Sequence, residues 1–154
     1  MYLAIDPGGT TGWALFDEKG DTKGIGKIKG HDDFLDWLED TVHLHEPPVK
    51  VFILENYKVG RSGGSQFTHS FSDVPTLQLI GAIKRVAKKA NITIVEQSPN
   101  EMYIGLRYIG LWSLYRAGGK AAHVPDEQSA LAHGVYYLVK IGLRKHRLDK
   151  DAKE

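Results

Sequence analysis

The chain has 154 residues, of which 42% are hydrophobic and 25% are charged, and this composition is typical of one globular domain with its own core. It contains no cysteine, which excludes disulfides, thiolate-bound zinc and a cysteine nucleophile. The formal net charge is only +1, so the chain as a whole is not strongly basic. No apolar run approaches the length of a membrane span and no basic leader precedes the first apolar segment. We therefore expect a soluble, cytoplasmic protein with no membrane contact.

The first third of the chain predicts an antiparallel meander of three strands and then a helix. The apolar segments that predict strands are 2–6, 12–17 and 22–29, with a turn at 18–20 between the last two. Apolar residues then recur at helical spacing over 31–45, and Pro47 and Pro48 end that helix.

The rest of the chain predicts strands that alternate with helices. A strand over 49–54 is followed by a loop over 58–73 that is rich in glycine and serine, a helix over 75–90 and a strand over 91–96. A short helix after Ser98 and a last helix from Pro125 follow, while 106–120 has no clear period. This order predicts an α/β fold with a five-stranded mixed sheet, an antiparallel meander plus parallel strands, flanked by helices. We assign residues 1–143 to this domain and 144–154 to a charged C-terminal tail.

Three acidic residues stand where a fold of this kind would bring them together. Asp6 ends the first strand before a Pro-Gly-Gly turn, Glu55 ends the fourth strand, and Asp126 opens the last helix. Each acid taken alone has an ordinary explanation, such as a place in a turn or the stabilisation of acidic side chains at the start of a helix. Ligand sites gather at the carboxyl ends of parallel strands, so the joint placement indicates a site. Carboxylates suit Mg²⁺ or Mn²⁺, and two such ions about 3.5–4 Å apart would serve phosphodiester hydrolysis.

Four segments, in this order, resemble the motifs of RuvC-type Holliday junction resolvases, in particular their small phage-encoded branch. They are residues 4–12 (AIDPGGTTG), 53–56 (ILEN), 95–99 (VEQSP) and 126–133 (DEQSALAH). The resemblance implies an RNase H-like fold and a homodimer that cuts two opposing strands of a four-way DNA junction with Mg²⁺ or Mn²⁺ at a two-metal site. For a phage-encoded member the site of action is the host cytoplasm. Carried over by motif, Asp6, Glu55 and Asp126 are the catalytic metal ligands.

The last helix departs from the family pattern at one position. Asp126, Ser129 and His133 share a helical face. The family often has two acidic or His/Asp positions three residues apart on that helix, and here the second position is Ser129. Either Ser129 orders a metal-bound water, or Glu127 or His133 replaces the missing ligand, or the second ion binds more weakly. The sequence leaves these alternatives open.

The resemblance also implies DNA contacts outside the acidic site. The residues that we expect to bind backbone phosphates, to stack at the junction centre or to extend a DNA or dimer surface are Lys58, Arg61, Phe67, His69, Lys84 and Lys88.

Three other functions fit the same residues. The first is a less selective RNase H-like nuclease that acts on flaps, hybrids or other branched DNA. The second is an inactive junction-binding module, for which Ser129 is the best argument. The third is a fragment of an actin-like ATPase, because that superfamily shares the fold and also begins with an acid-glycine-threonine turn, although it needs two such domains to enclose a nucleotide.

Overall fold

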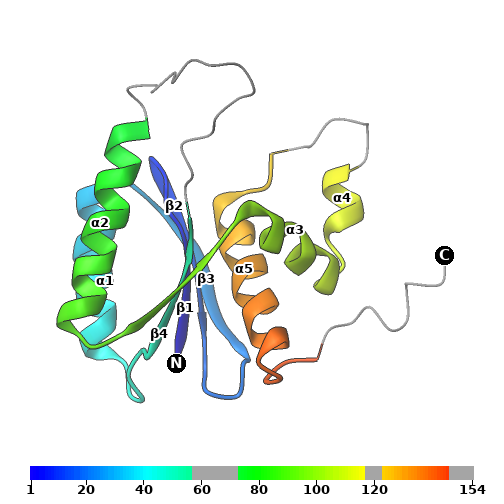
Figure 1. The fold of residues 1–154 in the computed structure, drawn as a ribbon, viewed down its shortest axis with the longest axis horizontal. Coiled ribbons are helices and arrows are strands. Elements are labelled where there is room, and N and C mark those ends of the chain that lie inside the picture. The colour runs from blue at the N-terminus through cyan, green and yellow to red at the C-terminus, as the bar shows by residue number, and fades with distance from the viewer. Residues whose placement is uncertain (57–72, 117–122, 146–154) are drawn as a thin grey trace.

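The computed structural model of the protein describes residues 1–56, 73–116 and 123–145. The strands in these ranges are β1 (Tyr2–Asp6), β2 (Thr10–Phe16), β3 (Thr22–Lys29), β4 (Val51–Glu55) and β5 (Thr93–Gln97). The helices are α1 (His31–Leu44), α2 (Asp73–Lys89), α3 (Pro99–Tyr108), α4 (Trp112–Arg116) and α5 (Asp126–Lys140). Figure 1 shows α1 and α2 against one face of the sheet and α5, with α3 and α4 beyond it, on the other.

The sheet is mixed, as the sequence predicted. Its strand order is β3-β2-β1-β4-β5. β1 and β2, and β2 and β3, pair antiparallel, whereas β1 and β4, and β4 and β5, pair parallel. The carboxyl ends of β1, β4 and β5 therefore lie at the same end of the sheet, which is where we expected a site.

The two faces of the sheet bury two separate cores. Strands β1 and β4 are apolar on both faces, as central parallel strands usually are. The core under α1 and α2 includes Leu3, Ile5, Phe34, Leu38, Phe52, Leu54, Leu79 and Ile83. The core under α5 includes Ala4, Ala14, Phe16, Ile53, Ala130, Val135 and Leu138. Each central strand is thus held from both sides, and its last residue is fixed in place.

Helix α5 approaches the sheet very closely because glycine stands at its contacts. A Cβ atom added to Gly12 of β2 would lie 2.0 Å from the carbonyl oxygen of Asp126, so the first turn of α5 rests directly on this strand. A Cβ atom on Gly134 would lie 2.2 Å from the ring of Phe16. These two contacts fix where the start of α5, and with it Asp126, stands above the sheet.

Some predicted boundaries differ from the observed ones for local reasons. Helix α2 starts ahead of Pro75, because a proline in the first helical turn lacks only an N–H that has no helical partner there. Strand β5 starts at Thr93 and not at residue 91, because Asn91 adopts a φ of 56° and the N–H of Ile92 bonds to the carbonyl of Ala87 at 2.8 Å. Helix α3 extends to Tyr108, into a segment without a clear sequence period.

The described part of the predicted tail contacts the sheet. The guanidinium of Arg144 donates a hydrogen bond to the hydroxyl of Thr22 on β3 at 3.1 Å. Residues 146–154 lie outside the described ranges. Among the helices of the described ranges, none combines the length and the apolar character that crossing a membrane requires.

Candidate active site

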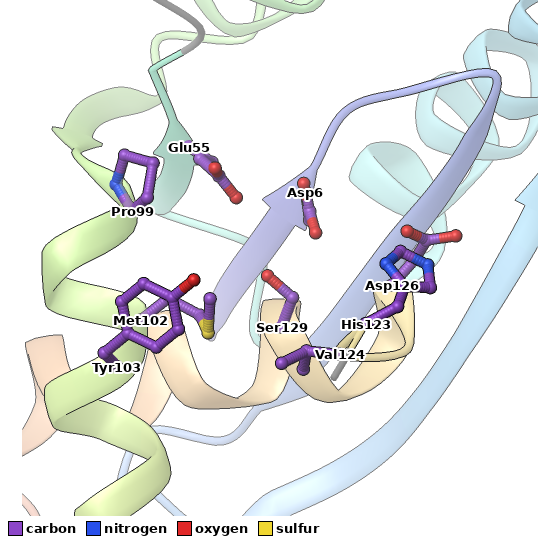
Figure 2. A pocket seen from close by; sticks show the side chains of 9 residues that line it. All are labelled: Asp6, Glu55, Pro99, Met102, Tyr103, His123, Val124, Asp126 and Ser129. Atoms are coloured by element: carbon purple, nitrogen blue, oxygen red, sulfur yellow. The ribbon is translucent and has the colours of Figure 1, made fainter. Parts of the chain in front are cut away.

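A cavity of about 380 Å³ opens at the carboxyl ends of β1 and β4. Its lining residues are Asp6, Glu55, Pro99, Met102, Tyr103, His123, Val124, Asp126 and Ser129. Figure 2 shows Asp6, Glu55 and Ser129 directed into it, with the side chains of α3 forming one wall. The structure thus brings all four residues of the predicted metal site to one pocket.

Strand register explains how the acids meet. One row of residues crosses the sheet at this level: Lys27 on β3, Gly12 on β2, Asp6 on β1, Glu55 on β4 and Gln97 on β5. The last residue pair of the parallel strands β1 and β4 is Ile5 with Leu54. Asp6 and Glu55 are the next residues of these strands, so they continue the row. Side chains of directly opposite residues project from the same face, so this row lies under α5.

Asp6 and Glu55 form a hydrogen-bonded carboxyl pair. Burial raises the pKa of Asp6 to about 8, and the charge of Glu55 contributes in the same direction, against the hydrogen bond from Ser129. Burial also acts to raise the pKa of Glu55, but the hydrogen bond and the charge of His133 outweigh it and hold that pKa below its usual range. Because the two pKa values move in opposite directions, there is a pH range in which Asp6 keeps a proton that Glu55 has lost, and the hydrogen-bonded pair then shares this one proton.

Ser129 is a residue of the last helix that contacts both members of this pair. Its side chain is buried and hydrogen-bonds to both Asp6 and Glu55. The position at which the family often has a second acid thus places a hydroxyl against the two carboxylates. Of the three residues that the sequence left open, Ser129, Glu127 and His133, Ser129 is the one that both lines the pocket and hydrogen-bonds to the two acids.

Asp126 faces the pair from the other side of the pocket. Burial raises its pKa, the charges of His123 and Lys27 lower it, and Glu127 raises it again. Its own charge contributes to the raised pKa of Asp6, so the two acids lie within electrostatic reach. Within the described ranges, however, no three His, Asp or Glu side chains stand close enough to hold one ion together. The close pair is Asp6 with Glu55, and Asp126 remains apart from it (Figure 2).

His133 stands behind Glu55 and does not line the pocket. It is fully buried, with Nε2 3.0 Å from Oε2 of Glu55 and Nδ1 2.7 Å from Oε1 of Gln97. Both ring nitrogens are therefore engaged by the protein. Glu127 does not line the pocket either, and one of its carboxylate oxygens is buried without a hydrogen-bond partner among the described residues.

Gln97 belongs to the surroundings of the site, although the sequence had given it no role. It lies at the end of β5 opposite Glu55, and its side chain is buried against His133. The signal was present, because a polar residue that ends a strand parallel to an acid-ending strand belongs to the same sheet end. The Nε2 of Gln97 has no partner in the part of the chain that the structure describes.

The predicted DNA contacts fall into two groups. Lys58, Arg61, Phe67 and His69 lie outside the described residues. The other two belong to α2, on the sheet face opposite α5. Lys84 forms an ion pair with Glu96, and Lys88 is exposed in the last turn, beside the amino ends of β4 and β5.

The donor set fits a hard divalent cation. Two carboxylates in contact, a hydroxyl beside them and a third carboxylate across the pocket offer only oxygen atoms. The shared proton between Asp6 and Glu55 relieves the same repulsion that a bound cation would relieve. The pocket is therefore suited to a cation in the place of that proton.

The sheet order, with helices on both faces, places the protein in the RNase H-like class of α/β folds. The solved structures that it resembles include two of RuvC from Thermus thermophilus. RuvC in complex with a Holliday junction substrate superposes with a TM-score of 0.64 at 13% sequence identity, over 94% of this chain and 98% of that one. Another Thermus thermophilus RuvC structure gives a TM-score of 0.52 at 17% identity with the same coverage. No family model and no curated protein matches the chain.

Proposed function

We propose that the protein is a metal-dependent endonuclease that resolves four-way DNA junctions by paired phosphodiester hydrolysis. The observation that carries this proposal is the hydrogen-bonded pair of Asp6 and Glu55 in one pocket with Ser129 and Asp126. The fold supports it, because it resembles over nearly its whole length a RuvC solved with a Holliday junction substrate.

The residues of the pocket have distinct tasks in this proposal. Asp6, Glu55 and Asp126 would hold Mg²⁺ or Mn²⁺, and the Ser129 hydroxyl would hydrogen-bond to Asp6 and Glu55 beside the ions. When bound, such ions lower the pKa of a water and neutralise charge on the phosphodiester. To serve as a ligand Asp6 would have to be ionised, since a carboxyl group binds a cation as the carboxylate. Water then adds across the P–O bond without a covalent enzyme intermediate.

The proposal extends to the assembly and to the DNA contacts. Symmetric cutting of two opposing strands favours a twofold homodimer. We retain Lys58, Arg61, Phe67, His69, Lys84 and Lys88 as proposed DNA contacts. Membership of the phage-encoded branch and action in the host cytoplasm also stay predictions from the sequence resemblance.

The test is cleavage of labelled four-way, flap, RNA–DNA hybrid and duplex substrates with Mg²⁺, Mn²⁺ or a chelator. We expect paired nicks in the four-way substrate that require metal and disappear in Asp6→Asn, while this variant still binds the junction. Equal cutting of flaps or hybrids would identify a less selective nuclease. ATP turnover without any DNA cleavage would favour the actin-like alternative.

The second candidate is a junction-binding module without nuclease activity. It is favoured by Ser129 and by the separation of Asp126 from the close pair within the described residues. It predicts junction binding with no cleavage at any concentration of Mg²⁺ or Mn²⁺, an outcome that the same assay detects.

A further inference from the structure

The edge strand β3 presents different residues on its two faces. Gly24 and Gly26 lie under the ring of Trp13, and a Cβ atom on Gly26 would lie 2.7 Å from that ring. Ile25, Lys27 and Lys29 project from the other face and are exposed. Because Lys27 is directly opposite Gly12, which touches the start of α5, both lysines belong to the face of the sheet that carries the pocket.

Lys27 stands beside the acidic site without belonging to it. It occupies the same row across the sheet as Asp6, separated from it by Gly12. The first turn of α5 rests on Gly12, so Asp126 lies between the carboxyl pair and Lys27. The charge of Lys27 is one of those that lower the pKa of Asp126, against the burial that raises it.

These two ammonium groups are available to a ligand. Among the described residues, neither Lys27 nor Lys29 takes part in an ion pair, whereas Lys23 of the same strand pairs with Asp17 at 3.4 Å. Lys29 pairs with Thr10 in the sheet, at the same end as the pocket. Residues two apart on a strand project from one face about 6.8 Å apart, so the two lysines form a short cationic row that leads away from the pocket.

We propose that Lys27 and Lys29 bind consecutive backbone phosphates of the DNA strand that enters the pocket, on the side of Asp126 away from Glu55. This inference rests on the proposed function and adds a binding surface to it. A phosphodiester backbone is repelled by the three acids, and a cationic row beside them offsets this repulsion where the strand leaves the site. Lysine suits the task, because its ammonium binds phosphate as a flexible point charge without base specificity.

The experiment measures the affinity for a labelled four-way junction at several salt concentrations, with Ca²⁺ as the added ion to limit cleavage. For the variant with Lys27→Ala and Lys29→Ala we expect a loss of affinity of about tenfold or more. The slope of log K against log salt should become less steep by about 2, since two phosphate contacts are lost. Lys23→Ala is the matched control, since it removes a lysine of the same strand that is already paired, and its slope should equal that of the wild type.

The outcomes separate this inference from the proposed function. An unchanged salt slope in the double variant, with cleavage by the wild type intact, would overturn the phosphate contacts and leave the nuclease standing. If Lys27 only balances the charge of Asp126, its substitution shifts the Mn²⁺ concentration needed for cleavage but not the salt slope, and this also overturns the inference. If the wild type neither binds nor cuts junctions, both the phosphate contacts and the proposed nuclease function are wrong.

Discussion

His133 holds Glu55 from inside the protein, with its Nε2 3.0 Å from the Glu55 carboxylate. Its other ring nitrogen lies 2.7 Å from the side-chain oxygen of Gln97, so the ring cannot turn without breaking a buried contact. The chain Gln97–His133–Glu55 thus fixes the direction of a carboxylate that faces the pocket. Outer partners of this kind commonly change metal affinity or activity by 10–100-fold when removed.

We therefore predict that His133→Leu raises the Mn²⁺ concentration for half-maximal cleavage by about tenfold or more. His133→Gln, which retains a donor toward Glu55, should recover part of the loss. Mn²⁺ binding measured by calorimetry reports the same effect without DNA. Leu38→Ala is the control for lost stability, because Leu38 is fully buried in the opposite core. Equal Mn²⁺ affinity in His133→Leu and the wild type would show that His133 only fills space.

Substitution of Asp126 distinguishes most sharply between a nuclease and an inactive junction-binding module. Asp126 lines the pocket but stands apart from the close pair of Asp6 and Glu55. If it is a ligand, Asp126→Asn should reduce cleavage by more than about 100-fold while junction binding persists. Asp36→Asn, at an exposed acid on α1, should cut like the wild type. Cleavage by Asp126→Asn at the wild-type rate would show that the third acid has no part in the reaction.

The features that the sequence predicted correctly are those that follow from the apolar pattern of single strands and from their order along the chain. Apolar runs ended by an acid predicted β1 and β4, and parallel pairing then made Asp6 and Glu55 neighbours. The mixed sheet followed from the order of strands and helices, and the structure confirms it.

The features that remained open depend on how elements pack. The sequence placed His133 on the helical face of Asp126, but its position behind Glu55 depends on the depth at which α5 sits over Gly12. The part proposed for Lys27 depends on the register of β3 against β2. Gly105 of α3 packs against the backbone of Ala132 on α5, a contact that no apolar side chain reveals in the sequence.

The shared proton of the carboxyl pair predicts how the stability of the metal-free protein depends on pH. The pKa of Asp6 is about 8 in the folded protein, against an ordinary value of 3.8. Between these values the folded state binds more protons than the unfolded state, so stability falls as the pH rises through this window. The raised pKa of Asp126 acts in the same direction. The lowered pKa of Glu55 acts in the opposite direction, but only under more acidic conditions.

Thermal unfolding in the presence of a chelator should therefore show a melting temperature that declines from about pH 5 to about pH 8. The decline should be smaller in Asp6→Asn, because an amide does not titrate. Saturating Mn²⁺ should restore stability most at the alkaline end, and its binding should release protons near neutral pH. A melting temperature that is flat or rises across this range in the wild type would contradict the shared proton.

The contact between Gly12 and Asp126 gives the last prediction. A Cβ atom at residue 12 would lie 2.0 Å from the carbonyl oxygen of Asp126, a collision with backbone that no side-chain rotation relieves. Gly12→Ala should therefore push the first turn of α5 away from the sheet and destabilise the fold by about 1–3 kcal/mol or more. Since Asp126 moves with that turn, cleavage should fall further than the loss of folded protein explains.

Gly81→Ala is the matched control for this change. Gly81 is exposed on α2, and a Cβ atom there meets nothing within 4 Å. In a helix this substitution is expected to stabilise by about 0.5–1 kcal/mol, and cleavage should not change. Urea unfolding and cleavage rates per folded molecule, measured on both variants, separate backbone displacement from a general effect of added side chains. If Gly12→Ala folds and cuts like the wild type, the close contact between β2 and α5 does not position Asp126. The site would then tolerate a displacement of the helix.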